Sequence, residues 1–334
     1  MSCLYVTEQG AKITVEPGKI VVECRVGMRR LVPEQTLESI VIFGNVVLTL
    51  PAQKRCLEDG ISVTMLSTGG HYFGRLVSTS HMNARRLKKQ IYLSDNSEQT
   101  LLLGKKIMSC KIHNQKVLLR RYARNNAADI SDKIREITAL EKVLERSNSL
   151  DQLLGYEGAA ARAYFDALSR LIRPEFAFKG RNRRPPKDPF NAMISLGYTI
   201  LFYEIFAEIE NRSLSPYVGF IHRIKENHPA LVSDFLEEWR AVIVDATVMS
   251  MIQGNEISPE DFQKDEETEG IFLNKKALQN YIRKLESKMR SSMHYLDYLE
   301  NPVSFRKGIW WQIKSLSSCV DNSDFTDYDP LRIR

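Results

Sequence analysis

The hydrophobic pattern of the chain changes its period near residue 80. Before that point, apolar residues occur in short β-branched runs that alternate with turn formers such as EPGK and EDG. The segment PAQKRCLEDG predicts one short helix, because Pro51 suits a first turn and Gly60 an end. STGGHYFG is expected to form a turn. The runs predict strands over 12–16, 19–26, 39–50 and 61–66.

After residue 80, apolar residues recur three and four positions apart, which is the period of a helix that faces a core. Asp188 before Pro189 predicts a helix start, since aspartate caps a helix and proline fits its first turn. The predicted helices cover 83–93, 101–124, 128–147, 191–209 and 233–252.

These two patterns indicate an α+β protein. Its 334 residues are enough for two domains. We expect a small N-terminal β domain over 1–82 and a larger all-α domain over 83–318. The remaining segment, 319–334, is rich in acidic residues, and we expect it to be a mobile tail.

Positive charge is concentrated in two stretches. The chain has 47 Lys and Arg against 41 Asp and Glu, a net charge of +6. Between Arg75 and Arg124, 12 basic residues face only two acidic ones, Asp95 and Glu98. A second basic stretch is RLIRPEFAFKGRNRRPPK (170–187). Clustered cations favour a polyanion such as nucleic acid, and a solvated helix face is the alternative.

Several function classes lack their sequence signals. The five cysteines form no CxxC, so we expect reduced thiols and neither a zinc site nor a disulfide framework. We expect no membrane span and, because MSCLYVTEQG lacks signal-peptide features, a cytoplasmic location. No phosphate loop or nucleophile elbow occurs. The absence of a phosphate loop is compatible with an ATP-independent reaction that exchanges one phosphodiester for another.

Candidate metal ligands occur in three segments of the helical half. Glu157 lies in LLGYEGAAARAYF, His222 ends SPYVGFIH, and SDFLEEWR contains Asp234, Glu237 and Glu238. Spacings of three and four place these three acids on neighbouring positions of a helix, with Leu236 and Trp239 directed to the core. Carboxylates with one imidazole suit Mg²⁺ or Mn²⁺. Such a metal beside a basic surface indicates phosphodiester chemistry.

Each candidate ligand also has an ordinary structural interpretation. Glu157 could be a carboxylate at a helix start, favoured by the macrodipole. His222 could be a core or capping histidine, and DFLEE could be a solvated helix face. The distances between these residues along the chain do not decide between the interpretations.

Four blocks, however, resemble the signature blocks of a known family: LLGYEGAAARAYF, PPKDPFNAMISLGYTIL, SPYVGFIH and SDFLEEWRAVIVD. The family is the CRISPR-associated integrase–endonuclease of spacer acquisition. GNVVLTLPAQKRCLEDGISVTML and GGHYFGRL resemble its β domain. The resemblance implies a β-sandwich-like domain that forms a homodimer and a helical metal-dependent catalytic domain. It also implies a small ferredoxin-like CRISPR-associated partner protein and double-stranded DNA, both incoming spacer fragment and repeat.

The resemblance further implies roles for individual residues. Glu157, His222 and Glu237 would be the catalytic metal ligands, with Asp234 as an auxiliary ligand or as the residue that orients His222. Which of Asp234 and Glu237 is the main third ligand stays open. Asn191 would hydrogen-bond a phosphate or ligand. The expected DNA-backbone contacts are Arg85, Arg86, Lys88, Lys89, Arg181, Arg183 and Arg184.

The implied function is insertion of spacer DNA into a CRISPR array by attack of a 3′-hydroxyl on the repeat phosphodiester. One alternative is a metal-dependent DNA repair nuclease acting on branched or single-stranded DNA, with water as its only nucleophile. A second alternative is a nucleic-acid scaffold without catalytic activity.

Overall fold

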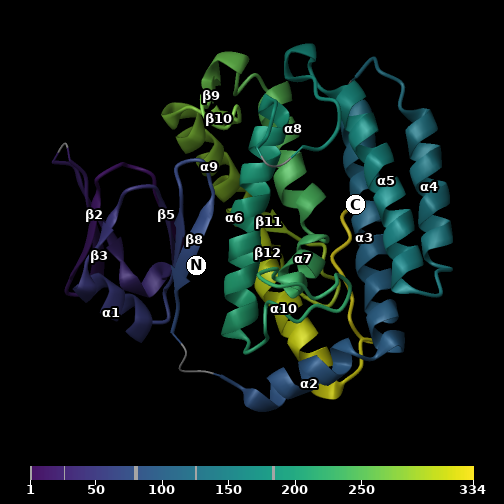
Figure 1. Ribbon diagram of the computed structural model, residues 1–334, viewed down its shortest axis with the longest axis horizontal. Coiled ribbons are helices and arrows are strands. Elements are labelled where there is room, and N and C mark those ends of the chain that lie inside the picture. The colour runs from purple at the N-terminus through teal and green to yellow at the C-terminus, as the bar shows by residue number, and fades with distance from the viewer. Residues whose placement is uncertain (1, 26, 79–81, 125, 183–184) are drawn as a thin grey trace. The chain divides into compact units, whose positions relative to one another are not determined.

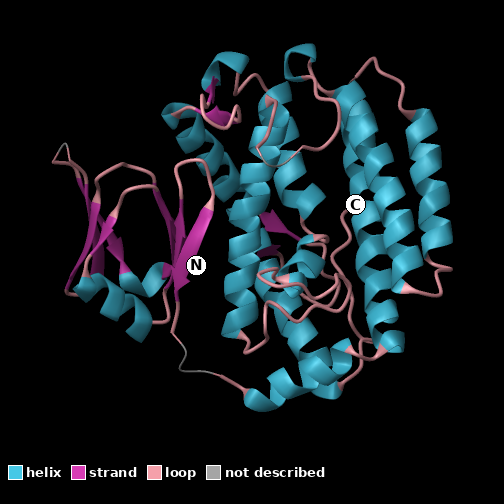
Figure 2. Ribbon diagram, in the orientation of Figure 1, coloured by secondary structure: helices cyan, strands magenta, loops and turns pink. Residues whose placement is uncertain are grey.

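The structure is a computed structural model that describes residues 2–25, 27–78, 82–124, 126–182 and 185–334. The chain divides into two compact units, Met1–Met82 and Asn83–Arg334. The first consists mainly of strands and the second mainly of helices (Figure 2). The expected α+β class is therefore confirmed.

Two sheets make up the N-terminal unit as far as it is described. In spatial order, the first contains β1 (Ser2–Val6), β5 (Leu37–Phe43), β7 (Ser62–Leu66) and β8 (Tyr72–Leu76). The second contains β4 (Arg29–Pro33), β3 (Lys19–Glu23), β2 (Lys12–Glu16) and β6 (Val47–Leu48). Helix α1 (Leu50–Glu58) lies between β6 and β7 in the sequence, and Pro51 occupies its first turn as expected.

One hydrophobic core joins these elements. It gathers Ile13 and Ile20 from the second sheet, Ile40 and Val63 from the first, and Cys56 from α1. The apolar run of β5 is nearly continuous because this strand lies between two parallel neighbours, β1 and β7, and is largely buried.

Three strands of the N-terminal unit were not predicted from the sequence: β1, β4 and β8. Strand β4, RRLVP, exposes most of its side chains at a sheet edge and pairs with β3 through its backbone. Such a strand needs no alternating apolar pattern. Part of the expected turn STGGHYFG is instead the start of β8, which pairs antiparallel with β7.

The helical unit contains all of the α-helices that the structure describes except α1 (Figure 1). They are α2 (Ala84–Ser94), α3 (Ser97–Ala123), α4 (Ser131–Leu144), α5 (Leu150–Leu171), α6 (Pro189–Asn211), α7 (Ala230–Leu236), α8 (Ala246–Gln253), α9 (Lys275–Arg290) and α10 (Phe305–Asn322). A π-helical segment, η3 (Arg240–Asp245), connects α7 to α8. Two short strand pairs complete the unit: β9 (Phe262–Lys264) with β10 (Ile271–Leu273), and β11 (Ser292–Met293) with β12 (Val303–Ser304).

Helix α6 is the apolar centre of this unit. It begins as predicted: the Asp188 side chain accepts a hydrogen bond from the backbone N–H of Asn191, 2.8 Å away, and Pro189 occupies the first turn. By length and composition α6 could cross a membrane, but 56% of its most apolar window is buried inside the protein. Its apolar character is therefore that of a core helix.

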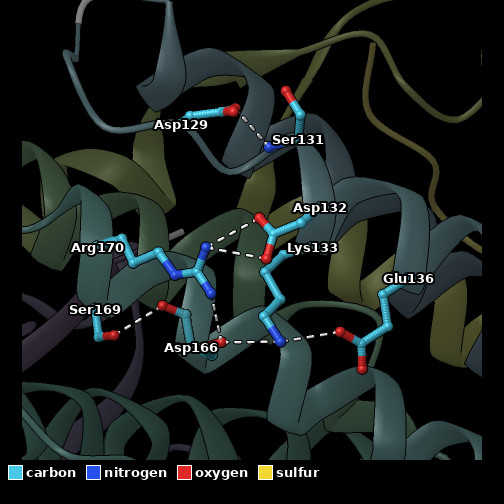
Figure 3. Close-up of polar contacts among 8 residues, drawn as sticks. All are labelled: Asp129, Ser131, Asp132, Lys133, Glu136, Asp166, Ser169 and Arg170. Carbon is cyan, nitrogen blue, oxygen red and sulfur yellow. Dashed lines mark hydrogen bonds and ion pairs between the residues drawn. The ribbon is translucent and has the colours of Figure 1, made fainter.

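Helices α4 and α5 lie side by side and are joined on their outer surface by ion pairs (Figure 3). Lys133 Nζ lies 3.0 Å from Asp166 Oδ2, and Arg170 donates to Asp132 over 2.9 Å. Exposed pairs of this kind contribute little free energy, because water and salt screen them. They contribute to the alignment of α5 against α4 but do little for overall stability.

The prediction of a mobile acidic tail over 319–334 is wrong. Residues up to Asn322 belong to α10, and the segment that follows lies against α3 (Figure 1). Asn114 of α3 donates to the Leu331 carbonyl over 2.9 Å and accepts from the Ile333 N–H over 3.0 Å. Acidic composition suggested mobility, but the apolar residues between the acids are buried: Phe325, Tyr328, Leu331 and Ile333.

Candidate active site

A cavity of about 330 Å³ in the helical unit brings together the three predicted ligands. Glu157 comes from α5, His222 from the segment between α6 and α7, and Glu237 from the C-terminal end of α7. All three line the cavity, along with Lys111 of α3 and Arg240 of η3. Residues separated by 65 and 15 positions in the sequence thus share one site.

Glu157 is not a helix-start carboxylate. Helix α5 begins at Leu150 with Ser149 as its cap, so Glu157 lies about two turns inside, beyond the reach of the N-terminal partial charge. A Cβ atom added at Gly155 would meet nothing within 4 Å, and one at Gly158 only Arg162, 3.8 Å away. The glycines therefore leave the surface beside Glu157 open.

Two cations compensate the buried carboxylates of the cavity. Lys111 Nζ contacts the Glu157 carboxylate and lies 2.6 Å from Glu237 Oε2. The Arg240 guanidinium forms an ion pair with the other oxygen of Glu237 at 3.0 Å. Burial by itself raises the pKa of Glu237, but the positive charges of Arg240 and Lys111 outweigh it and hold that pKa below its usual range.

His222 is oriented by Asp234. Its Nδ1 lies 2.6 Å from Asp234 Oδ1, so the other ring nitrogen, Nε2, is left for a ligand. Burial is the largest single effect and lowers the pKa of His222, but the hydrogen bond to Asp234 and the negative charges of Asp234 and Glu237 together outweigh it, so the net shift is upward.

Both oxygens of Asp234 also accept backbone N–H groups of the loop. The donors are Phe220 at 2.7 Å, Ile221 at 3.0 Å and His222 at 2.8 Å. A Cβ on Gly219 would lie only 2.9 Å from Asp234 Oδ2, so this close approach requires glycine. Of the two roles considered for Asp234, this geometry favours the orienting role.

The three acids of DFLEE separate in the structure. Glu237 faces the cavity, whereas Glu238 is buried on the side of the C-terminal segment, where it accepts from Tyr328, Gln312 and the Leu331 N–H. The π-helical segment η3 begins just beyond them, and such segments shift the register of the side chains that follow. Leu236 and Trp239 are buried, as predicted.

Another part of the cavity wall combines the Tyr198 ring with the Arg240 guanidinium, and Arg181 lies next to this ring. The Tyr198 ring lies 5.1 Å from the Arg240 guanidinium and 5.4 Å from that of Arg181. Its hydroxyl donates to the buried carboxylate of Asp245 over 2.7 Å. Sequence reasoning missed Lys111, Arg240 and Tyr198 as site residues. Only the spacing of three between Glu237 and Arg240 gave a usable signal.

Asn191 does not face the cavity, which corrects the prediction for this residue. It is fully buried, and its amide donates to the Gly180 carbonyl over 2.9 Å and to Asp188 over 2.8 Å. Its Oδ1 accepts from Arg181. Asn191 therefore anchors the loop before α6, because its polar atoms are already hydrogen-bonded within the protein.

The predicted DNA-contact residues fall into four groups. Arg181 is one of them, and its guanidinium donates to the Asn191 side chain. Arg86 and Lys89 are hydrogen-bonded to Asp321 at the end of α10, with Arg86 Nη2 2.6 Å from its carboxylate. Arg85 and Lys88 are exposed on α2. Arg183 and Arg184 lie outside the described residues. Charge counting overestimated the basic surface, because Arg86, Lys89, Lys111 and Lys116 all have partners inside the protein.

The side chains of Glu157, His222 and Glu237 suit a divalent cation, although the Lys111 ammonium lies between the two carboxylates. Among the described residues, no three Asp, Glu, His or Cys side chains are close enough to form a metal cluster as they stand. Yet Glu237 Oε2 is buried and accepts no hydrogen bond of good geometry from the described part of the chain. Two carboxylates and an imidazole nitrogen at one cavity are the ligand chemistry of Mg²⁺ or Mn²⁺.

The fold and cavity define a class of two-unit proteins in which a strand-rich unit precedes a helical unit with a carboxylate–histidine site. The family model described as "CRISPR associated protein Cas1" matches residues 4–287. A relative from Mycobacterium tuberculosis named CRISPR-associated endonuclease Cas1 is 34% identical over 318 residues, 95% of this chain and 94% of that protein. The chain belongs to the Cas1 family, and the resemblance found in the sequence blocks is confirmed.

Solved structures agree at the level of the fold. A protein of a Cas6-RT-Cas1–Cas2 complex matches with a TM-score of 0.86 at 24% identity, covering 100% of this chain and 36% of that chain. A casposase bound to its integration product matches with a TM-score of 0.82 at 21% identity, covering 100% and 96%. The fold of this chain is thus shared with a casposase and with a protein of a Cas6-RT-Cas1–Cas2 complex.

Proposed function

We propose that this protein is a divalent-metal-dependent DNA endonuclease and integrase that inserts spacer DNA into a CRISPR array. The observation that carries the proposal is the convergence of Glu157, His222 and Glu237 on one cavity. Membership of the Cas1 family supports it, as does the endonuclease name of the M. tuberculosis relative. The fold shared with a casposase bound to an integration product supports the integration chemistry.

In the proposed reaction, a 3′-hydroxyl of the incoming DNA attacks a phosphodiester at the edge of a repeat. One phosphodiester bond forms and one breaks, so no energy source is required. Glu157, Glu237 and His222 Nε2 would hold Mg²⁺ or Mn²⁺, which when bound polarises the scissile phosphate and stabilises the attacking and leaving oxygens. The hydrogen bond to Asp234 fixes the imidazole so that Nε2 remains available.

The cations of the cavity would act on the substrate. Arg240 and Lys111 place positive charge beside the carboxylates, where it offsets repulsion between them and a phosphate. The exposed Arg85 and Lys88 on α2 and the guanidinium of Arg181 are proposed contacts to the DNA backbone. Contacts of this kind position DNA without reading its sequence.

We propose two protein partners. The Cas1–Cas2 complex among the structures of this fold supports a small ferredoxin-like CRISPR-associated protein as one of them. The other is a second copy of this chain, bound through the N-terminal unit, where Met28, Leu31 and Phe73 are exposed. The free thiols of Cys3, Cys24, Cys56, Cys110 and Cys319 support a reducing, cytoplasmic location.

A strand-transfer assay tests the enzymatic proposal. The substrates are a labelled duplex with free 3′-hydroxyls and a supercoiled plasmid that carries the repeat, with Mn²⁺, Mg²⁺ or EDTA. We expect joined product only with metal, and Glu157→Gln should lower its yield by about a hundredfold or more, because a metal ligand is lost. Asp166→Asn, on α5 but outside the cavity, should keep the native yield.

Other outcomes would favour the alternatives. Hydrolysis of DNA without joined product would favour a repair nuclease. Equal activity of the native protein and Glu157→Gln, with no response to Mn²⁺, would favour a scaffold without catalysis. A duplex with 3′-dideoxy ends separates joining from hydrolysis, since it leaves only water as nucleophile.

A further inference from the structure

Lys111 is a buried cation located between two proposed metal ligands. Its side chain is 6% exposed, and its Nζ contacts the Glu157 carboxylate and lies 2.6 Å from Glu237 Oε2. Burying an ammonium group costs several kcal/mol unless it is paired with good geometry. The two carboxylates provide that pairing, and Lys111 in turn compensates their mutual repulsion.

A divalent cation held by Glu157 and Glu237 would compete with Lys111 for the same two carboxylate groups. Carboxylate ligands approach Mg²⁺ to about 2.0–2.1 Å, so an ammonium in contact with both carboxylates cannot keep its place when the metal binds. The two cations would also repel each other strongly at such a short separation. Lysine ends in a compact charge on a flexible four-carbon stem, so its ammonium can move while α3 stays in position.

We propose that Lys111 is a positioning residue that acts as the counter-cation of the metal-free site and competes with the divalent cation for Glu157 and Glu237. The inference rests on the proposed function, because it requires a metal at these carboxylates. Lys111 keeps the two ligands together before the metal arrives. The same charge weakens metal binding, since the ammonium has to be displaced.

The chain offers a matched control in Lys116. This residue lies five positions further along α3, its side chain is 10% exposed, and its Nζ pairs with Glu141 of α4. It does not line the cavity. Lys116→Met removes a buried lysine–glutamate pair from the same helix, so it reproduces the loss of stability without changing the charge at the metal ligands.

The test measures binding of Mn²⁺ alone to the full-length protein by isothermal titration calorimetry, and thermal unfolding in EDTA and in saturating Mn²⁺. Lys111→Met should bind Mn²⁺ about ten- to a hundredfold more tightly, because one positive charge a few ångströms away is removed. It should also unfold at a lower temperature than the native protein in EDTA and recover more on addition of Mn²⁺. Lys116→Met should unfold earlier in EDTA but bind Mn²⁺ with native affinity.

Lys111→Gln, which removes the charge but keeps a polar side chain at this position, provides a second variant if Lys111→Met does not fold. Unchanged or weaker Mn²⁺ binding by the folded Lys111 variant would overturn the inference, and the proposed function would stand as long as Glu157→Gln abolishes binding. If the native protein binds no Mn²⁺, or if Glu157→Gln binds it normally, the proposed function fails along with the inference.

Discussion

Asp234 decides how the imidazole of His222 is presented. Its two carboxylate oxygens accept from Nδ1 of His222 and from three consecutive backbone N–H groups, Phe220 to His222. One buried side chain thus fixes both the loop and the ring. A residue of this kind supports a metal site without binding the metal, because it sets the orientation of a ligand.

Asp234→Asn should therefore weaken Mn²⁺ binding by about ten- to a hundredfold. An amide nitrogen cannot accept the N–H groups that now donate to the carboxylate, so the loop and the ring lose their common anchor. The affinity can be measured by electron paramagnetic resonance of free Mn²⁺. Asp151→Asn is the control, because Asp151 pairs with Arg223 of the same loop while both side chains are 75% exposed. Native affinity in Asp234→Asn would contradict the orienting role.

At the scale of elements, α7 and η3 connect the cavity with the C-terminal segment. Glu237 faces the cavity, and the next residue, Glu238, receives hydrogen bonds from Tyr328 and from the Leu331 N–H. The residue that faces the cavity and the residue that holds the C-terminal segment are therefore neighbours in the sequence. The packing of the last residues of the chain therefore supports the helix that carries a proposed ligand.

Glu238 makes the attachment of this segment dependent on pH. Burial raises the pKa of Glu238 from its ordinary value to about 7, against the opposing effect of its hydrogen bonds. Because this pKa is higher in the folded than in the unfolded state, the stability it contributes is complete at acidic pH and is lost as pH rises through about 7. The loss is on the order of 3–4 kcal/mol.

Glu238→Gln should remove this dependence, because glutamine does not titrate. Thermal unfolding of the native protein and of Glu238→Gln, measured in EDTA between about pH 5 and pH 8, tests the expectation. The difference in melting temperature between the two proteins should change in favour of the variant as pH rises. If the difference in melting temperature stays constant across this pH range, Glu238 binds the same number of protons in the folded and in the unfolded state, and the expectation is wrong.

At the scale of the whole molecule, the two units carry different proposed tasks. The helical unit contains the cavity, and the N-terminal unit exposes large apolar side chains, among them Phe73, which is 67% exposed on β8. An aromatic side chain this exposed at the edge of a sheet favours burial against another molecule. We assign it to the proposed homodimer.

Phe73→Asp should shift the protein from dimer to monomer, because a carboxylate at the interface loses its hydration. Light scattering coupled to size-exclusion chromatography measures the mass directly. Val143→Asp, at an exposed apolar position of α4 in the helical unit, should leave the dimer intact. If Phe73→Asp forms a dimer as stable as the native one, the interface lies elsewhere. If the native protein is a monomer, the proposed homodimer is excluded.

The local pattern of the sequence was sufficient for much of this protein. The change of period near residue 80, the cap of α6 at Asp188 and the three candidate ligands all follow from short-range spacing, or from blocks that resemble one family. Charge counting was less reliable. It cannot distinguish a lysine on the surface from Lys111 or Lys116, whose charges are paired inside the protein.

The sequence by itself predicted a strand-rich segment followed by a helical one, because the period of the hydrophobic pattern is a local property, and its resemblance to one family singled out Glu157, His222 and Glu237 as candidate ligands. Only the tertiary structure decided that Lys111 lies between the carboxylates, that Asp234 holds the imidazole, that Asn191 is turned inward and that the tail is packed. These facts depend on contacts between residues far apart in the chain. Such contacts form only when the helices pack, and spacing along the sequence does not encode them.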